Sequence, residues 1–182
     1  MALKFTTSYL EDSLELFRSY KKLGERAMEQ LPEAKLFAQL DDESNSIAII
    51  VKHMAGNMRS RWTDFLTTNG EKPDRQRDTE FVQPPATRAE LMKVWEEGWD
   101  CVWRALGPLG ENDLARTVTI RGENHSVMQA INRQLAHYPY HVSQIVMLAK
   151  HFRSEQWKSL TVPKNKSAEF NQKVATGEKS QR

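Results

Sequence analysis

His137 and His141 are the two residues of this sequence whose type and spacing point most directly to chemistry. Side chains four residues apart on an α-helix project from the same face, one above the other. At this spacing both imidazoles can reach one divalent metal ion, with metal–nitrogen distances of about 2.0–2.1 Å. The pair alone also fits a simpler interpretation, with one histidine on the surface and the other hydrogen-bonded in the core. A metal site therefore needs a further ligand from elsewhere in the chain.

The third ligand must come from the three remaining histidines, which are His53, His125 and His151. We expect His53, because it lies in a second strongly helical stretch. There it begins a polar row that continues through Asn57, Arg61 and Asp64 at spacings of three to four residues. On its own, such a row is typical of a solvated helix face. The alternative is that the row lines a polar pocket, with His53 as a ligand and Asn57 or Arg61 contacting a substrate.

The composition is typical of a soluble globular protein. A chain of 182 residues is long enough for one domain with a substantial core and hardly long enough for two. There is no apolar run of the length that a membrane span needs, and the N-terminus lacks the apolar segment of a secretory signal. The single cysteine, Cys101, excludes an intramolecular disulfide. We therefore expect a cytoplasmic protein without a membrane partner.

The formal net charge of +2 is unevenly distributed. Residues 153–182 carry seven basic and three acidic side chains, so residues 1–152 have a small negative excess. A nucleic-acid binder is expected to carry a basic stripe on its folded part. We therefore do not expect nucleic acid as a partner.

Four amphipathic segments follow one another along the chain, and three of them begin at a capping box, a Ser or Thr with Glu or Gln three residues later. The predicted helices cover about residues 8–30, 46–66, 87–106 and 126–152. Pro139 lies in the last helix, between the two histidines, and costs about 3 kcal/mol in a regular helix because it removes a backbone donor. We expect this helix either to kink there or to be held by tertiary contacts.

The remaining segments carry weaker patterns. Residues 71–86 form a charged, proline-rich loop, and such long loops are often functional or mobile. Residues 114–121 include one β-branched, extended segment, but no second segment of comparable strength, so we expect no sheet. Trp95, Trp99 and Trp103 recur every four residues, which favours a core or a subunit interface over a ligand platform.

These elements predict an all-α protein, a four-helix bundle over residues 1–162 with a polar, mobile tail over residues 163–182. Metal sites in such bundles are built in the interior from side chains on facing helices. His53, His137 and His141 would together supply three neutral nitrogens, which leaves a coordination position open for water or substrate. Imidazole ligands suit zinc, nickel, iron or copper, and we expect one divalent ion per chain, with zinc or nickel ranked first.

Several blocks of the sequence recur in one known superfamily, namely residues 45–48, 52–58, 59–65, 67–73, 120–123, 131–135 and 137–141. In these blocks the sequence resembles the DinB-like (YfiT-like) superfamily of four-helix metal-binding proteins, and in particular a bacterial branch of unknown function. The resemblance extends over about residues 5–165. It implies a metal bound by one histidine of the second helix and an H-x-x-x-H pair of the fourth, here His53, His137 and His141. Pro139 departs from the helix-forming residue expected within that pair. The resemblance also implies a homodimer, and some relatives use low-molecular-weight thiols such as bacillithiol or mycothiol.

Two functions are consistent with these observations. The first is an enzyme in which a thiol cosubstrate binds the open metal as a thiolate and attacks an electrophile, as in S-transfer or related detoxification chemistry. Asn57, Arg61 and Tyr140 lie within a turn or two of the ligands and are candidates for orienting the substrate. The second is a non-catalytic, metal-binding homodimer of a stress response. DNA repair, which only the superfamily name suggests, is disfavoured by the charge distribution.

Overall fold

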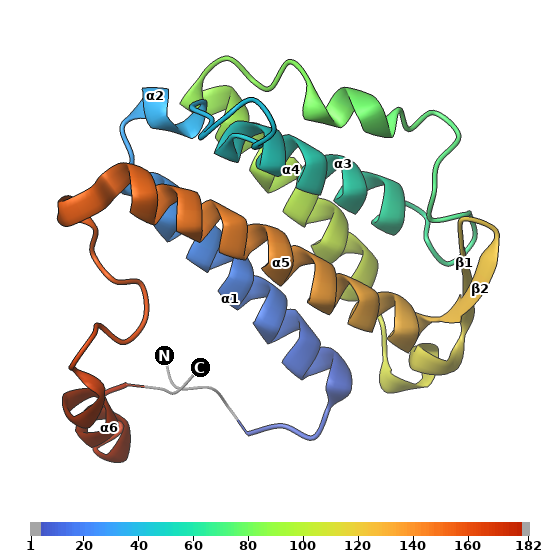
Figure 1. The fold of residues 1–182 in the computed structure, drawn as a ribbon. Coiled ribbons are helices and arrows are strands. Elements are labelled where there is room, and N and C mark those ends of the chain that lie inside the picture. The colour runs from blue at the N-terminus through green and yellow to red at the C-terminus, as the bar shows by residue number, and fades with distance from the viewer. Residues whose placement is uncertain (1–4, 180–182) are drawn as a thin grey trace.

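The computed structural model describes residues 5–179, which are mostly helical. Four long helices, α1 (Tyr9–Glu29), α3 (Ile47–Trp62), α4 (Arg88–Leu106) and α5 (Val127–Arg153), run alongside one another in Figure 1. The most extensive packing is between α3 and α4 and between α1 and α5, and α3 also packs on α5. The histidines predicted as ligands therefore lie on two helices that are in contact.

Each long helix begins at a side-chain cap. The hydroxyls of Ser8, Ser46, Thr87 and Ser126 each accept a hydrogen bond from the backbone N–H three residues later. At Thr87 and Ser126 the capping box is complete, because the side chain of the third helical residue accepts in return from the backbone N–H of the cap. These bonds satisfy N–H groups that a helix leaves unpaired at its start. The caps therefore fix the predicted starting points of all four helices.

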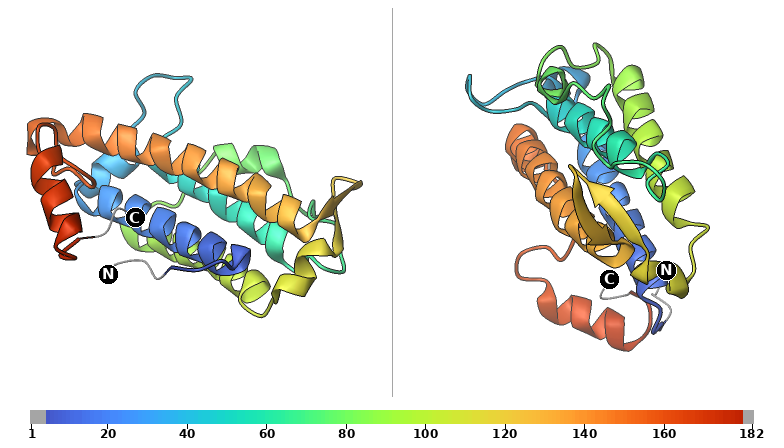
Figure 2. Two further views of the ribbon diagram at one scale, coloured as in Figure 1. Left: turned by 90° about the horizontal axis from the view of Figure 1, so that it is seen from below. Right: turned by 90° about the vertical axis from the view of Figure 1, so that its right-hand side faces the viewer.

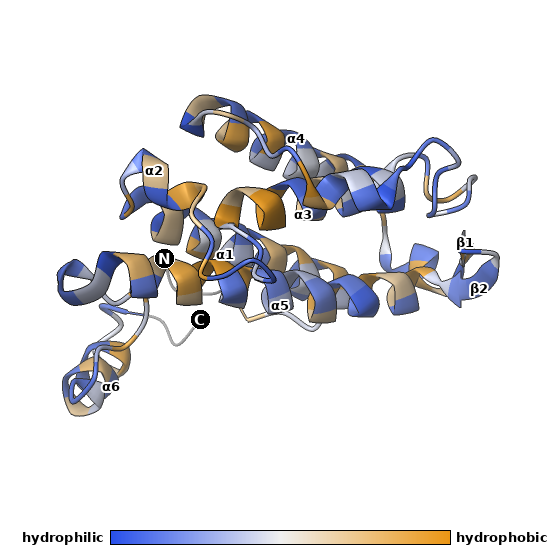
Figure 3. Ribbon diagram, turned by 45° about the horizontal axis from the view of Figure 1, so that its top comes forward, coloured by the Kyte–Doolittle hydropathy of each residue, from blue (hydrophilic) through white to orange (hydrophobic). Residues whose placement is uncertain are grey.

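The core lies among the four long helices. Phe17 of α1, Trp99 of α4 and Tyr138 of α5 are fully buried, and their ring centroids lie 5.6 to 6.3 Å apart. Trp95 is also buried, and Trp103 is half-buried and stacks on Trp99. Figure 3 shows hydrophobic residues recurring between hydrophilic ones along the long helices. The tryptophan row of α4 therefore belongs to the core.

Helix α5 continues without a break through Pro139. Next to the proline, the buried Tyr138 hydroxyl accepts a hydrogen bond of 2.8 Å from Trp62 Nε1 at the end of α3. This bond and the burial of Tyr138 fasten α5 to its neighbour at the position where the proline removes a backbone donor. The tertiary contacts that one of the two alternatives for Pro139 requires are therefore present.

The expectation that the chain forms no sheet is wrong. Strand β1 (Thr117–Ile120) pairs in an antiparallel manner with β2 (Glu123–Ser126). The two-residue connection, Arg121 and Gly122, has φ angles of +53° and +82°, as a type I′ hairpin turn requires. The predicted extended segment is therefore present, but its partner has a polar sequence without strand periodicity. Turn geometry, rather than strand propensity, forms this hairpin.

Several short elements lie where the sequence predicts irregular chain. The loop between α3 and α4 contains the 3-10 helix η1 (Arg77–Phe81), which packs along α3. Other short elements are α2 (Glu33–Leu36), η2 (Glu111–Ala115) and η3 (Ser154–Gln156). Helix α3 ends at Trp62, four residues earlier than predicted.

The two ends of α5 lead into different features. Figure 2 shows the hairpin at the N-terminal end of α5 and α6 (Ser167–Ala175) beyond its C-terminal end. Helix α6 lies within the segment predicted as a mobile tail, so part of that tail is helical, while the domain boundary at residues 162 and 163 stays a prediction. Within residues 5–179, every helix is too short or too polar to cross a membrane.

Candidate metal centre

Three imidazoles meet between α3 and α5. One ring nitrogen from each of His53, His137 and His141 lies within 4.8 Å of the corresponding nitrogens of the other two. The Nε2 atoms of His137 and His141 are 3.0 Å apart, and the ring of His53 stands nearly edge-on to both. The structure therefore brings together the three residues that the sequence predicts as ligands. The other two histidines, His125 and His151, are not part of this group.

Each of the three imidazoles has an oxygen acceptor at its Nδ1 atom. Nδ1 of His53 is 2.9 Å from Glu80 Oε2, that of His137 is 3.2 Å from Gln134 Oε1, and that of His141 is 3.0 Å from Gln144 Oε1. An acceptor at Nδ1 favours the tautomer that carries its proton there, which leaves the Nε2 lone pair free for a metal. The three residues thus fit a three-nitrogen metal site by their hydrogen bonding as well as by their distances.

Burial favours the neutral, metal-binding form of the two histidines on α5. Burial, together with the proximity of His141 and His53, lowers the pKa of His137 to about 3. Burial also lowers the pKa of His141. A metal binds neutral imidazole, and an imidazole that is already deprotonated at neutral pH has no proton to lose on binding. The electrostatic environment therefore favours the ligand form of both groups.

Glu80 is a site residue that the sequence did not indicate. Its buried carboxylate accepts hydrogen bonds from Arg75 Nε at 2.8 Å and Arg75 Nη2 at 3.0 Å, in addition to its contact with His53. Burial raises the pKa of Glu80, but the hydrogen bonds from His53 and Arg75 outweigh this effect and lower it overall. An ionised carboxylate at Nδ1 orients a ligand histidine and makes it more basic.

Gly56 provides the space for the Glu80 carboxylate. A Cβ atom at Gly56 would lie 2.6 Å from Glu80 Cδ, which is closer than two such atoms approach. A glycine inside a helix is unfavourable relative to alanine, so its presence calls for a local reason. Gly56 is therefore the residue of the sequence from which a close approach of another segment to this face of α3 could have been inferred.

The polar row of α3 is buried rather than solvated. His53, Asn57 and Arg61 are 5%, 7% and 4% exposed. Asp64 lies beyond the end of the helix and is exposed, so it is not part of this face. Tyr140, on α5, is 62% exposed, with its ring 5.1 Å from that of His141. The solvated-face interpretation of this row is therefore wrong for its first three members.

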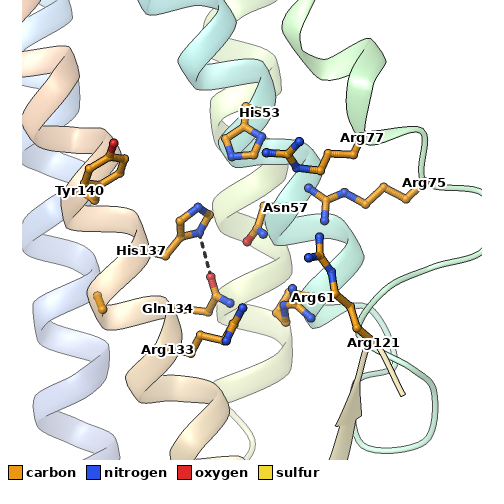
Figure 4. Close-up of a pocket in the computed structure, with 11 residues that line it drawn as sticks. His53, Asn57, Arg61, Arg75, Arg77, Arg121, Arg133, Gln134, His137 and Tyr140 are labelled. Carbon is orange, nitrogen blue, oxygen red and sulfur yellow. Dashed lines mark hydrogen bonds between the residues drawn. The ribbon is translucent and has the colours of Figure 1, made fainter. Parts of the chain in front are cut away.

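A pocket of about 640 Å³ opens beside the imidazoles. Two of the three histidines, His53 and His137, line it together with Asn57 and Tyr140. Its other polar lining residues are Gln134 and five arginines, Arg61, Arg75, Arg77, Arg121 and Arg133. Figure 4 shows that these side chains come from α3, α5, the loop after α3 and the hairpin. A molecule in this pocket would contact the histidine cluster on one side and guanidinium groups on the other.

Comparison with known proteins gives one family. A family model described as "Protein of unknown function (DUF1572)" matches residues 4–166. A search of curated proteins found no match. The matched range includes both helices that carry the three histidines, and also the loop that carries Glu80.

Proposed function

This chain belongs to the DUF1572 family of proteins of unknown function, and we propose that it is a metal-dependent enzyme. The observation that carries the proposal is the convergence of His53, His137 and His141, each with an oxygen acceptor at Nδ1. Three neutral nitrogen ligands with an open position are typical of catalytic rather than structural metal sites. The adjoining pocket, which His53 and His137 line, offers room for a substrate beside the cluster.

The proposal includes a DinB-like four-helix bundle as the fold and one divalent ion per chain as the cofactor. The packing of α3 on α4 and α1 on α5 supports the bundle, and so does the resemblance of the sequence to that superfamily. Zinc and nickel are our first candidates, with iron and copper next, because all four accept imidazole ligands. When bound, such an ion supplies a Lewis acid, which lowers the pKa of a coordinated thiol or water.

We propose thiol-dependent S-transfer as the reaction. The thiol sulfur would form a bond to an electrophilic carbon, the leaving group would depart with its electron pair, and the thiol proton would pass to solvent. Glu80 would hold the His53 ring in place through Nδ1, and the amide oxygens of Gln134 and Gln144 would do the same for the other two rings. Asn57 and Tyr140 line the pocket and would orient the bound molecule.

The assembly that we propose is a homodimer. Tyr140 and Met147 are large, exposed side chains seven residues apart on α5, so they lie on the same face of that helix. Light scattering should give twice the chain mass of 21.1 kDa. A monomer at the concentrations used for assay would contradict this part of the proposal without affecting the metal centre.

The experiment that tests the enzyme is a turnover assay on metal-loaded protein with several bacterial thiols and a panel of electrophiles. Consumption of thiol should require both substrates and should disappear in His141→Ala, while His151→Ala should retain it. Metal-loaded protein that turns over no thiol–electrophile pair would contradict S-transfer. Loss of the dimer on metal removal, again without turnover, would favour the alternative of a non-catalytic, metal-binding homodimer of a stress response.

A further inference from the structure

The pocket beside the histidine cluster carries an excess of positive charge. Five guanidinium groups line it, and none of its lining residues is acidic. The carboxylates that contact these arginines lie outside the pocket lining and are Glu71, Glu80 and the exposed Asp78, whose Oδ1 is 4.0 Å from Arg77 Nη1. Three carboxylates therefore contact five arginines, and the walls of the pocket carry a net positive charge.

Glu71 and Glu80 both pair mainly with one arginine, Arg75. Arg75 takes both oxygens of Glu80 and also donates to Glu71 from Nη1 at 3.2 Å. Glu71 is shared further, since Arg121 Nε lies at 3.3 Å and Arg61 Nη2 only at 4.0 Å. Within residues 5–179, Arg133 on α5 forms no ion pair. Arg77 has its own neighbour Asp78 at 4.0 Å, so the excess positive charge lies mainly on Arg61, Arg121 and Arg133, which have at most a share of Glu71.

Arg61 is the residue that points most strongly to an anionic ligand. The residue is 4% exposed, and its Nε and Nη1 atoms have no hydrogen-bond partner among the described residues. Burial lowers the pKa of Arg61, but a guanidinium in a protein stays charged. A buried charge without a good partner is strongly unfavourable, so such groups are generally paired with another charge or a ligand.

The position of Arg61 is fixed by the chain around it. A Cβ atom at Gly70 would lie 2.9 Å from Arg61 Nη1, so the absence of a side chain at Gly70 makes room for the guanidinium. The backbone of Gly70 is itself held, because its N–H donates to the Thr119 carbonyl of β1 and its carbonyl accepts from Ser60 Oγ. The hairpin and the loop after α3 thus pack together beside this cation.

We infer that the pocket binds an oxyanion, a carboxylate or phosphate group of the substrate or cosubstrate, through Arg61, Arg121 and Arg133. The planar guanidinium presents paired donors that match the oxygen geometry of both groups. Figure 4 shows these three arginines converging below His137 and Asn57. The anion would thus anchor the molecule while another part of it reaches the metal centre. This assignment rests on the proposed function for its role in catalysis, but anion binding itself does not require the metal.

Calorimetric titration of the metal-free, full-length protein with inorganic phosphate and, separately, with succinate tests the inference. At least one of the two should bind at millimolar concentration, and the stronger one identifies the preferred oxyanion. Arg133→Gln, which replaces an exposed side chain, should weaken binding about tenfold, equivalent to about 1.4 kcal/mol. Arg61→Gln should weaken it at least as much. Arg104→Gln is the matched control, because Arg104 is an exposed arginine of α4 outside this pocket.

The outcomes separate this inference from the proposed function. His141→Ala should lose metal and keep anion binding within about twofold, because His141 does not line the pocket. Anion binding without metal binding would support the anion site and contradict the proposed metal-dependent enzyme. Metal binding without anion binding would support the metal centre and contradict the anion site. If neither anion binds, or if Arg133→Gln binds as well as Arg104→Gln, the inference is wrong. Because Arg133 is exposed, its variant tests the site even if Arg61→Gln does not fold.

Discussion

Nδ1 of His53 lies 2.9 Å from Oε2 of Glu80, although 27 residues separate the two in the sequence. This contact joins α3 to the loop that precedes α4 and makes η1 part of the site. The same carboxylate is held by Arg75, so the orientation of one predicted metal ligand depends on a buried ion pair in a loop.

Glu80→Gln should weaken metal binding about 10- to 100-fold, the usual effect of losing a carboxylate that orients a ligand histidine. Gln keeps the size of the side chain but removes the negative charge that makes the imidazole more basic. Competition with a chromogenic chelator measures the affinity directly. Asp78→Asn, a fully exposed carboxylate in the same 3-10 helix, is the control and should bind like the wild type. Equal affinities in the two variants would contradict a role for Glu80 at the site.

Gly56→Ala should displace Glu80 from His53, because the new Cβ would overlap the carboxylate. We expect a loss of stability of about 1–3 kcal/mol, as for other overpacked positions, together with a loss of metal affinity. Chemical denaturation and the chelator assay measure the two effects. Gly110→Ala is the matched control, since the nearest atom to a Cβ there is 4.0 Å away. A Gly56→Ala protein with unchanged affinity would show that the contact between Glu80 and His53 is dispensable.

Tyr138→Phe should destabilise the protein by about 1–3 kcal/mol, because it leaves the buried Trp62 Nε1–H without an acceptor. It also removes a contact that holds α5 beside Pro139. Urea denaturation measures the change in the free energy of unfolding. Tyr140→Phe provides the comparison two residues away, and its 62% exposed side chain should make the change nearly neutral. Similar stabilities for the two variants would contradict this explanation of how α5 tolerates its proline.

The metal-free protein should lose stability as the pH falls from about 6.5 toward about 3. The pKa of His137 is about 3 in the folded protein, whereas the ordinary value for a histidine, as in the unfolded chain, is 6.5. Between these two pH values the unfolded chain therefore binds one proton more than the folded protein. Protonation therefore favours unfolding in this window, and above about pH 6.5 the effect vanishes. Thermal unfolding at a series of pH values should show a smaller decline for His137→Gln than for the control His151→Gln. Parallel pH profiles of the two variants would contradict the burial of neutral His137.

The features that could be predicted from the sequence are those that depend on residues close together in the chain. Three of the helix caps were indicated by a Glu or Gln three residues after a Ser or Thr, and the His137–His141 pair depends on a four-residue spacing within one helix. His53 could be identified because it lies in a second strongly helical stretch.

The features that could not be predicted depend on contacts between distant, irregular segments. Glu80 lies in a loop without periodicity, and its place beside His53 follows from how that loop packs on α3. The convergence of Arg61, Arg121 and Arg133 requires three separate elements to meet. The hairpin could not be predicted for another reason. It depends on the positive φ angles of Arg121 and Gly122 in the turn, and not on a strand pattern in both of its strands.

Metal content is the most direct test of the central claim. Untagged protein purified without chelators should be analysed by mass spectrometry beside His53→Ala and the control His151→Ala. A three-histidine centre predicts one divalent ion per chain in the wild type and in His151→Ala, and its loss in His53→Ala. A wild-type protein that carries no metal and also fails to bind added zinc or nickel would contradict the account, as would a His53→Ala protein that binds metal as tightly as the wild type.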